Sequence, residues 1–314
     1  MFEQQARKNP PEALEQGQVS IDNVIIASDV LAYKAKVSSR FEAEWILPKD
    51  EQIIESVVIY AHGGGFVAGS HHISRSIACE IALKSKCTAV LNVNYRLAPE
   101  YPFPAAPKDI FESLRYVVKR LGVEKERVVM MGDSAGASLC VSTLLKVKKR
   151  AASCNEDLMP GGCALLSPVF SLLPYSLEVF GLLYGLHPAG SSENESNDGD
   201  YEAKELNYVM GWERPDLSGF PPTLIQAGGG EVLRDDAKDF AEHAINCEVQ
   251  CQLEIYEGMF HAFQLFPRFV DAGKDAVVSI CTFVEATARQ QESKKATANI
   301  YSAIVKDSVR VGSN

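Results

Sequence analysis

The sequence predicts an α/β protein with a mostly parallel central sheet and helices on both faces. Short apolar runs alternate with segments of helical periodicity, and the run before residue 134 ends abruptly in a turn rich in small residues. Such alternation is typical of parallel strands joined by crossover helices. The chain has 314 residues, of which 46% are hydrophobic, which is enough for one large core. We therefore predict a single domain over residues 1–314.

The individual elements follow from their local patterns. Strands are expected at the apolar runs 57–61, 88–93, 127–131, 163–167, 223–227 and 252–256. Helices are expected over 76–85, over 107–121, where apolar residues recur at helical spacing, and from Ser134 onward. We expect the segments 19–26 and 41–47 to pair as an antiparallel edge of the sheet.

One long connection interrupts this alternation. Residues 172–217 contain an apolar patch followed by a polar, acidic stretch, and they exceed the length of an ordinary link between elements. We predict a small lid over the carboxyl ends of the strands, built from about residues 1–18 and 172–217.

Composition argues against several classes of partner. The net charge is −10 and the pI about 5.2, which disfavours binding to nucleic acid or to an anionic membrane. We expect no transmembrane segment, because no stretch reaches about 18 consecutive apolar residues, and no signal peptide, because the first residues lack an apolar core. The eight cysteines match no zinc-site spacing, and free cysteines favour a reducing compartment. We therefore expect a cytoplasmic protein.

Residues 132–136, Gly-Asp-Ser-Ala-Gly, directly follow an apolar run. This context is typical of a nucleophile elbow, a strained strand-to-helix turn that exposes the serine hydroxyl above the sheet. Gly132 and Gly136 are small enough for strand and helix to pass close to the serine. The structural alternative is a serine that only caps a helix. We expect Ser134 to be a nucleophile.

Residues 62–66, His-Gly-Gly-Gly-Phe, follow the first expected parallel strand. Consecutive glycines let a backbone turn present its N–H groups at close range. In acyl transfer such groups stabilise an oxyanion, together with the N–H of the residue after the nucleophile, Ala135. The alternative is a flexible turn with a packing histidine. We expect His62 to fix this loop, and His71 and His72 to lie at the surface.

A general base is expected on the loop after the last strand. Of the six histidines, His261 alone follows that strand, within residues 257–263. A loop at this place can bring an imidazole over the serine, and the chain order of serine, acid and histidine fits such a triad. This order favours His261 as the base over a half-buried structural histidine.

The acid that orients His261 has three candidates after the strand 223–227. Glu231 comes first, behind three glycines at 228–230 that permit a sharp turn. Asp235 and Asp236 come one helical turn later, where aspartate commonly caps a helix. We expect Glu231 to be the acid and keep Asp235 as the alternative.

Four motifs together resemble the hormone-sensitive-lipase family of α/β-hydrolases. They are His-Gly-Gly-Gly at 62–65, Asn-Tyr-Arg-Leu-Ala-Pro-Glu and Pro-Phe-Pro-Ala-Ala within 94–106, Gly-Asp-Ser-Ala-Gly at 132–136 and Gly-Met-Phe-His at 258–261. The resemblance extends from about residue 55 to about residue 285. It implies the α/β-hydrolase fold with a small lid.

The resemblance also implies roles for particular residues. Gly64, Gly65 and Ala135 would supply the oxyanion-hole N–H groups, and the block 95–100 would brace the loop beside the site. Many relatives carry Asp-Pro-Leu where this chain has Glu-Val-Leu at 231–233. Glutamate is an accepted triad acid, so this departure affects the assignment of the acid and not the chemistry.

The expected function is that of a serine carboxylesterase for small acyl esters of short to medium chain length, with no metal and no cofactor. An amidase or deacetylase of small N-acyl compounds on the same triad is an alternative, and so is a lipase of emulsified fat. A ligand-binding receptor on an inactive hydrolase scaffold is a further alternative. Such a receptor would keep the oxyanion loop and lose the base, whereas this chain has both Ser134 and His261.

Overall fold

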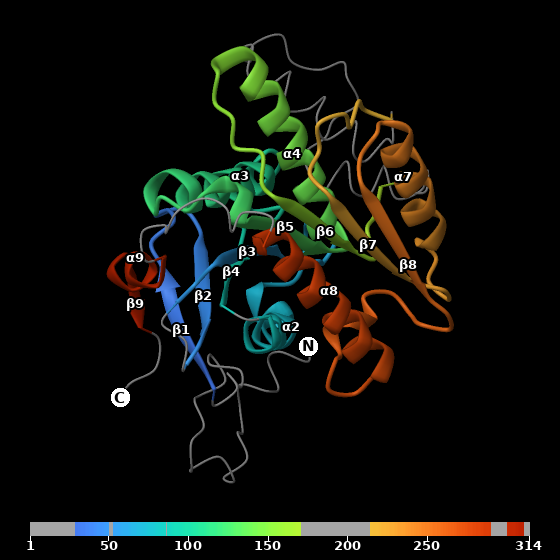
Figure 1. The fold of residues 1–314 in the computed structure, drawn as a ribbon, viewed down its shortest axis with the longest axis horizontal. Coiled ribbons are helices and arrows are strands. Elements are labelled where there is room, and N and C mark those ends of the chain that lie inside the picture. Colours follow the sequence, from blue (N-terminus) through green and yellow to red (C-terminus); the bar gives the residue numbers. More distant parts are fainter. Residues whose placement is uncertain (1–28, 50–52, 86, 171–213, 290–299, 311–314) are drawn as a thin grey trace.

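The computed structural model describes residues 29–49, 53–85, 87–170, 214–289 and 300–310, and a nine-stranded sheet forms their centre (Figure 1). The strands lie in the order β8-β7-β6-β5-β3-β4-β2-β1-β9. Their bounds are β1 Val30–Ala35, β2 Glu42–Pro48, β3 Ser56–Ala61, β4 Thr88–Asn94, β5 Val128–Asp133, β6 Gly162–Leu166, β7 Thr223–Gly228, β8 Cys251–Tyr256 and β9 Ser308–Arg310.

The predicted α/β class is confirmed. Strands β4, β3, β5, β6, β7 and β8 pair in parallel, and β2, β1 and β9 extend the sheet in antiparallel fashion. Every residue of β3 and β5 is buried, as expected for parallel strands covered on both faces. Parallel pairing brings the carboxyl ends of these strands to one edge of the sheet, where the segments after β3, β5, β7 and β8 meet.

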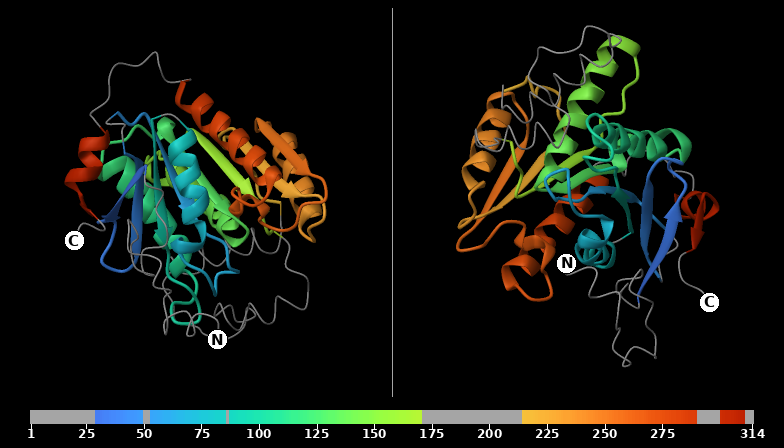
Figure 2. Two further views of the ribbon diagram at one scale, coloured as in Figure 1. Left: turned by 90° about the horizontal axis from the view of Figure 1, so that it is seen from below. Right: turned by 180° about the vertical axis from the view of Figure 1, so that it is seen from behind.

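Helices cover both faces of the sheet (Figure 2). One face carries α2 (His71–Lys84) and α8 (Asp271–Arg289), and the other carries α3 (Ala105–Arg115), α4 (Ala135–Cys154) and α7 (Arg234–Asn246). Smaller elements are a π-helical turn Tyr116–Arg120, 3-10 turns Lys125–Arg127 and Phe263–Leu265, and α9 (Ile300–Lys306).

Alternation along the strands builds two apolar layers. In β3, Val57 and Ile59 belong to the cluster under α3, α4 and α7, while Val58 and Tyr60 belong to the cluster under α2 and α8. Side chains of a strand point to opposite faces in turn, so each fully apolar strand contributes to both layers. The sheet is therefore a rigid platform for the segments at its carboxyl edge.

The expected edge pairing was wrong. Residues 41–47 form β2, but its partners are β1 on one side and β4 on the other, so both edges of β2 are occupied. The segment 19–26, which we expected beside it, lies outside the described residues. The expected helix 107–121 is divided, because α3 ends at Arg115 and a π-helical turn continues to Arg120.

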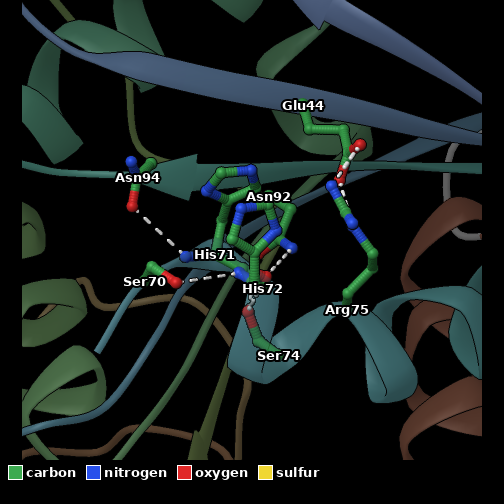
Figure 3. A network of polar contacts seen from close by, with 8 residues as sticks. All are labelled: Glu44, Ser70, His71, His72, Ser74, Arg75, Asn92 and Asn94. Atoms are coloured by element: carbon green, nitrogen blue, oxygen red, sulfur yellow. Dashed lines mark hydrogen bonds and ion pairs between the residues drawn. The ribbon is translucent and has the colours of Figure 1, made fainter. Parts of the chain in front are cut away.

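Hydrogen bonds connect the first turn of α2 to β4, as Figure 3 shows. Ser70 caps the helix through a hydrogen bond from the His72 N–H, and the His71 N–H donates to the Asn94 side chain at 3.3 Å. The Asn92 amide donates to the His71 carbonyl at 2.7 Å. His71 is buried, so the expectation that it lies at the surface was wrong, whereas His72 is half-buried. The expected helix 76–85 also begins earlier, at His71, because Ser70 provides the cap.

A buried ion pair adds a second link between α2 and the sheet (Figure 3). The Arg75 guanidinium donates from Nε and Nη2 to the two oxygens of Glu44 on β2, each at 2.8 Å. Both side chains are nearly fully buried, and a bidentate pair fixes orientation as well as distance. The chain that leaves the loop after β3 is therefore held firmly where α2 begins.

The predicted lid falls mostly outside the described residues, because residues 1–28 and 171–213 are not described. Its last residues lie against α4 and α7: Lys148 contacts Asp216 at 2.6 Å, and His243 Nε2 donates to the Pro215 carbonyl at 2.8 Å. Among the described helices, none combines the length and the apolar character required to cross a membrane.

Candidate active site

Ser134 lies at the turn between β5 and α4, with φ 51° and ψ −120°. This backbone conformation is disfavoured for a residue with a Cβ and is typical of strained functional turns. A Cβ at Gly136 would lie 2.0 Å from the Ala61 carbonyl oxygen, and one at Gly132 would lie 2.5 Å from the Gly136 carbonyl carbon. Both glycines are thus required by close backbone approach, as the motif predicts.

The loop after β3 lies against this turn. Gly64 and Gly65 have φ of 119° and 61°, which favour glycine, and a Cβ at Gly64 would lie 2.0 Å from the Ala68 carbonyl oxygen. A Cβ on Gly63 would lie 3.1 Å from the Ser134 Cβ. Within the described part of the chain, the Gly64 and Gly65 N–H groups donate to no backbone carbonyl. Ala135, as the first residue of α4, has an N–H without an intrahelical acceptor.

His62 and Tyr95 brace this loop. Their rings stack with centroids 4.2 Å apart, and the Tyr95 hydroxyl donates to the His62 carbonyl at 2.8 Å. The Ala98 N–H donates to the Phe66 carbonyl at 3.1 Å. The expectation that the block 95–100 braces the loop is therefore confirmed.

The imidazole of His62 is fully buried, and burial lowers its pKa to about 4. It is therefore neutral near pH 7, and its Nδ1–H donates to the Gly63 carbonyl at 2.7 Å. Its Nε2 is buried and has no hydrogen-bond partner among the described residues, whereas Ser134 Oγ contacts His261, so His62 is not in place to act as the base for Ser134. It holds the loop, as expected.

Asp133 is a site residue that the sequence reasoning missed. Its buried carboxylate accepts the Tyr60 hydroxyl at 2.9 Å and the Gly63 N–H. A Cβ at position 63 would lie 2.3 Å from Asp133 Oδ2, so only glycine leaves room for the carboxylate. The signal was present in the sequence, because an acid at the end of an apolar strand must find buried donors.

His261 lies on the loop after β8 and contacts the serine. Its Nε2 is 3.0 Å from Ser134 Oγ, and its Nδ1 is 3.2 Å from Glu231 Oε2. The loop turns at Gly258, with φ 73°, and the Met259 N–H donates to the Tyr256 carbonyl at 3.1 Å. One imidazole thus bridges a hydroxyl and a carboxylate.

Glu231 follows β7, and its side chain is fully buried. A Cβ at Gly228 would lie 2.3 Å from the Met259 carbonyl oxygen, and one at Gly229 would lie 2.9 Å from the Glu257 Cα. The glycines therefore let the acid segment and the histidine segment pass in direct contact. This proximity brings the carboxylate to the imidazole.

The other acid candidates lie in the first turn of α7 and have other partners. Helix α7 begins at Arg234 with Leu233 as its N-cap, so the expectation that Asp235 or Asp236 caps the helix was wrong. Asp235 is exposed and pairs with Arg234 at 3.0 Å. Asp236 accepts the Phe170 N–H at 3.2 Å.

Comparison with known proteins agrees with this architecture. A family profile described as "alpha/beta hydrolase fold" matches residues 58–265. The chain belongs to the α/β-hydrolase family and, within it, to the hormone-sensitive-lipase family, so the predicted resemblance is confirmed.

Similar proteins are esterases by name. An "Esterase" of Acinetobacter venetianus is 31% identical over 72% of this chain and 74% of its own length, and the "Carboxylesterase NlhH" of Mycobacterium tuberculosis is 30% identical over 70% of each. A crystal structure of EstE5 soaked with p-nitrophenyl butyrate is 27% identical, with a TM-score of 0.71 over 91% of this chain and 97% of that one. An esterase from the bacterial hormone-sensitive lipase family is 27% identical, with a TM-score of 0.70 over 87% of this chain and 94% of that one.

Proposed function

We propose that this protein is a serine carboxylesterase in which Ser134, His261 and Glu231 form the catalytic triad. The observation that supports this most directly is the position of the His261 ring, which is 3.0 Å from the serine oxygen and 3.2 Å from the glutamate. Nucleophile, base and orienting acid are then connected as the triad chemistry requires.

The proposed reaction has two halves. Ser134 Oγ attacks the ester carbonyl carbon while His261 Nε2 takes its proton, and the tetrahedral intermediate collapses as the imidazolium protonates the leaving alcohol. Water, deprotonated by the same imidazole, then releases the acid from the acyl-enzyme. Glu231 holds the imidazole in the tautomer with the proton on Nδ1 and stabilises its cation.

The oxyanion is proposed to bind the N–H groups of Gly64, Gly65 and Ala135. Support comes from the two glycines, whose N–H groups serve no backbone carbonyl in the described part of the chain, and from Ala135 at the start of α4. A helix N-terminus favours negative charge, so the Ala135 N–H suits a developing oxyanion, and the two glycine N–H groups of the loop after β3 would add two further donors. By analogy with a protease, loss of one such donor costs about 3 kcal/mol of transition-state stabilisation.

Small esters with short to medium acyl chains are the proposed substrates. A relative named "Acetyl-hydrolase" from Streptomyces hygroscopicus is 29% identical over 75% of this chain, and EstE5 was soaked with a butyrate ester.

We also propose that residues 1–314 form one domain, with a lid from about 1–18 and 172–217, and that the protein has a cytoplasmic location. None of the eight cysteines, all of which lie in the described residues, forms a disulfide, which is consistent with the latter.

A p-nitrophenyl ester series from acetate to palmitate tests this proposal. The wild-type protein should hydrolyse acetate and butyrate faster than palmitate at matched soluble concentration, and Ser134→Ala should hydrolyse none. Faster turnover of palmitate would contradict the proposed acyl range, whereas activity of Ser134→Ala within tenfold of wild type would contradict the triad.

A further inference from the structure

We infer that Ser167 is a positioning residue for His261, and that it acts through the backbone of Ala262. The inference rests on the proposed function. Ser167 is the residue directly after β6, and its side chain is fully buried. Its Oγ accepts the N–H of Ala262, which directly follows His261, at 3.0 Å.

The end of β6 contacts both halves of the proposed proton-transfer pair. The Leu166 carbonyl accepts the N–H of Ser134 at 2.8 Å, and the next residue, Ser167, accepts the N–H of Ala262. Two consecutive residues thus hold the backbone of the nucleophile and the backbone beside the base. The end of β6 therefore helps to fix the distance between Ser134 and His261.

Ser167 is itself held in place. Its φ is 44°, in the left-handed region, and its N–H donates to the Gln226 carbonyl of β7 at 2.6 Å. A residue fixed by two neighbouring strands has little freedom to move its hydroxyl. The acceptor it offers to the histidine loop is therefore preorganised.

The histidine loop needs such an anchor. The His261 side chain is 41% exposed, so packing alone does not fix it. Ala262 is buried, has a strained φ of 56°, and directs its N–H at the buried Ser167 hydroxyl. Without the Ser167 hydroxyl this N–H would lose its acceptor, and the loop would relax by moving the imidazole away from Ser134 Oγ.

A displaced imidazole has a specific consequence. His261 must both activate the serine and protonate the leaving alcohol, but p-nitrophenolate departs without a proton whereas an alkoxide does not. Loss of positioning should therefore reduce the hydrolysis of an alkyl ester more than that of a p-nitrophenyl ester of the same acid. A general loss of folded protein would reduce both equally.

The test compares kcat/KM for ethyl butyrate and p-nitrophenyl butyrate in Ser167→Ala and Ser167→Gly. Glycine removes the same hydroxyl but accepts the left-handed φ, so it keeps the test valid if the alanine variant folds poorly. Ser113→Ala is the matched control, because Ser113 is a buried serine whose Oγ donates to the Asp109 carbonyl at 2.9 Å in α3.

The expected result is a loss of about 100-fold on ethyl butyrate and about 10-fold on p-nitrophenyl butyrate in both Ser167 variants, with the control near wild type. Equal losses on the two esters, or no loss, would overturn the inference while leaving the triad intact. A wild-type protein that hydrolyses neither ester would instead overturn the proposed function.

Discussion

The ring of His62 stacks on the ring of Tyr95, and the Tyr95 hydroxyl donates to the His62 carbonyl at 2.8 Å. These two contacts join the start of the proposed oxyanion loop to the segment after β4. Both side chains are buried, so the loop conformation depends on the packed interior and not on solvent-exposed groups.

Tyr95→Phe should therefore affect catalysis more than stability. The variant keeps the stacked ring but removes one buried hydrogen bond, which costs about 1 kcal/mol in the free energy of unfolding. Because the loop would be less well ordered, kcat should fall about 10-fold with little change in KM. Steady-state kinetics and urea unfolding measure the two effects, and a change in KM alone would contradict this role.

Ser134→Gly should abolish activity and raise stability. The φ of 51° at this residue is strained for serine and allowed for glycine, so the free energy of unfolding should increase by about 1 kcal/mol. Ser134→Ala is the matched control, since it removes the hydroxyl and keeps the strain. If the two variants unfold at the same urea concentration, the turn stores no strain.

Glu231→Gln should lower kcat by orders of magnitude with little change in KM. The amide is uncharged and can present its N–H₂ group to the imidazole, which would then be held in the wrong tautomer; the corresponding loss in a protease is about 10⁴-fold. Asp235→Asn is the control, because Asp235 is exposed and contacts Arg234 and Lys238 rather than His261. An inactive Asp235→Asn beside an active Glu231→Gln would reassign the acid.

Two buried groups near the site should give opposite dependences of stability on pH. Burial raises the pKa of Asp133 to about 6, so this carboxyl binds its proton more tightly in the folded chain, and its contribution to stability falls as pH rises from about 4 to about 6. Burial lowers the pKa of His62 to about 4, so its contribution falls as pH drops from about 6.5 to about 4.

Asp133→Asn removes only the first of these contributions. The free energy of unfolding of the variant minus that of wild type should therefore increase between pH 4 and pH 6.5, by up to roughly 3 kcal/mol. Urea unfolding across this range measures the difference, whatever its offset from the lost hydrogen bonds. A difference that does not change with pH would show that Asp133 has an ordinary pKa in the folded chain.

Local motifs made most of the site predictable. The turn at Ser134 and the loop at Gly64 require glycine because backbone atoms approach closely there. The glycines stand within a few residues of each other, so both motifs can be recognised in the sequence. The central parallel strands β3 and β5 were visible because every residue in them is buried, so that both their faces are mostly apolar.

Long-range contacts were not predictable in the same way. Strand β1 is mostly apolar, but its place in the sheet depends on pairing with β2 and also with β9, which lies near the other end of the chain. His71 looked like a surface residue because its burial depends on Asn92 and Asn94 of β4. The role inferred for Ser167 depends on Ala262, 95 residues later in the chain.

The central claim is that Ser134 is the nucleophile of an esterase, and covalent labelling tests it most directly. The protein would be incubated with a serine-reactive phosphonate, and its mass, the modified peptide and its activity on p-nitrophenyl butyrate would be followed together. We expect one adduct per chain, on Ser134, formed in parallel with the loss of activity and absent from Ser134→Ala. An adduct on another residue, or full inactivation without modification of Ser134, would contradict the account.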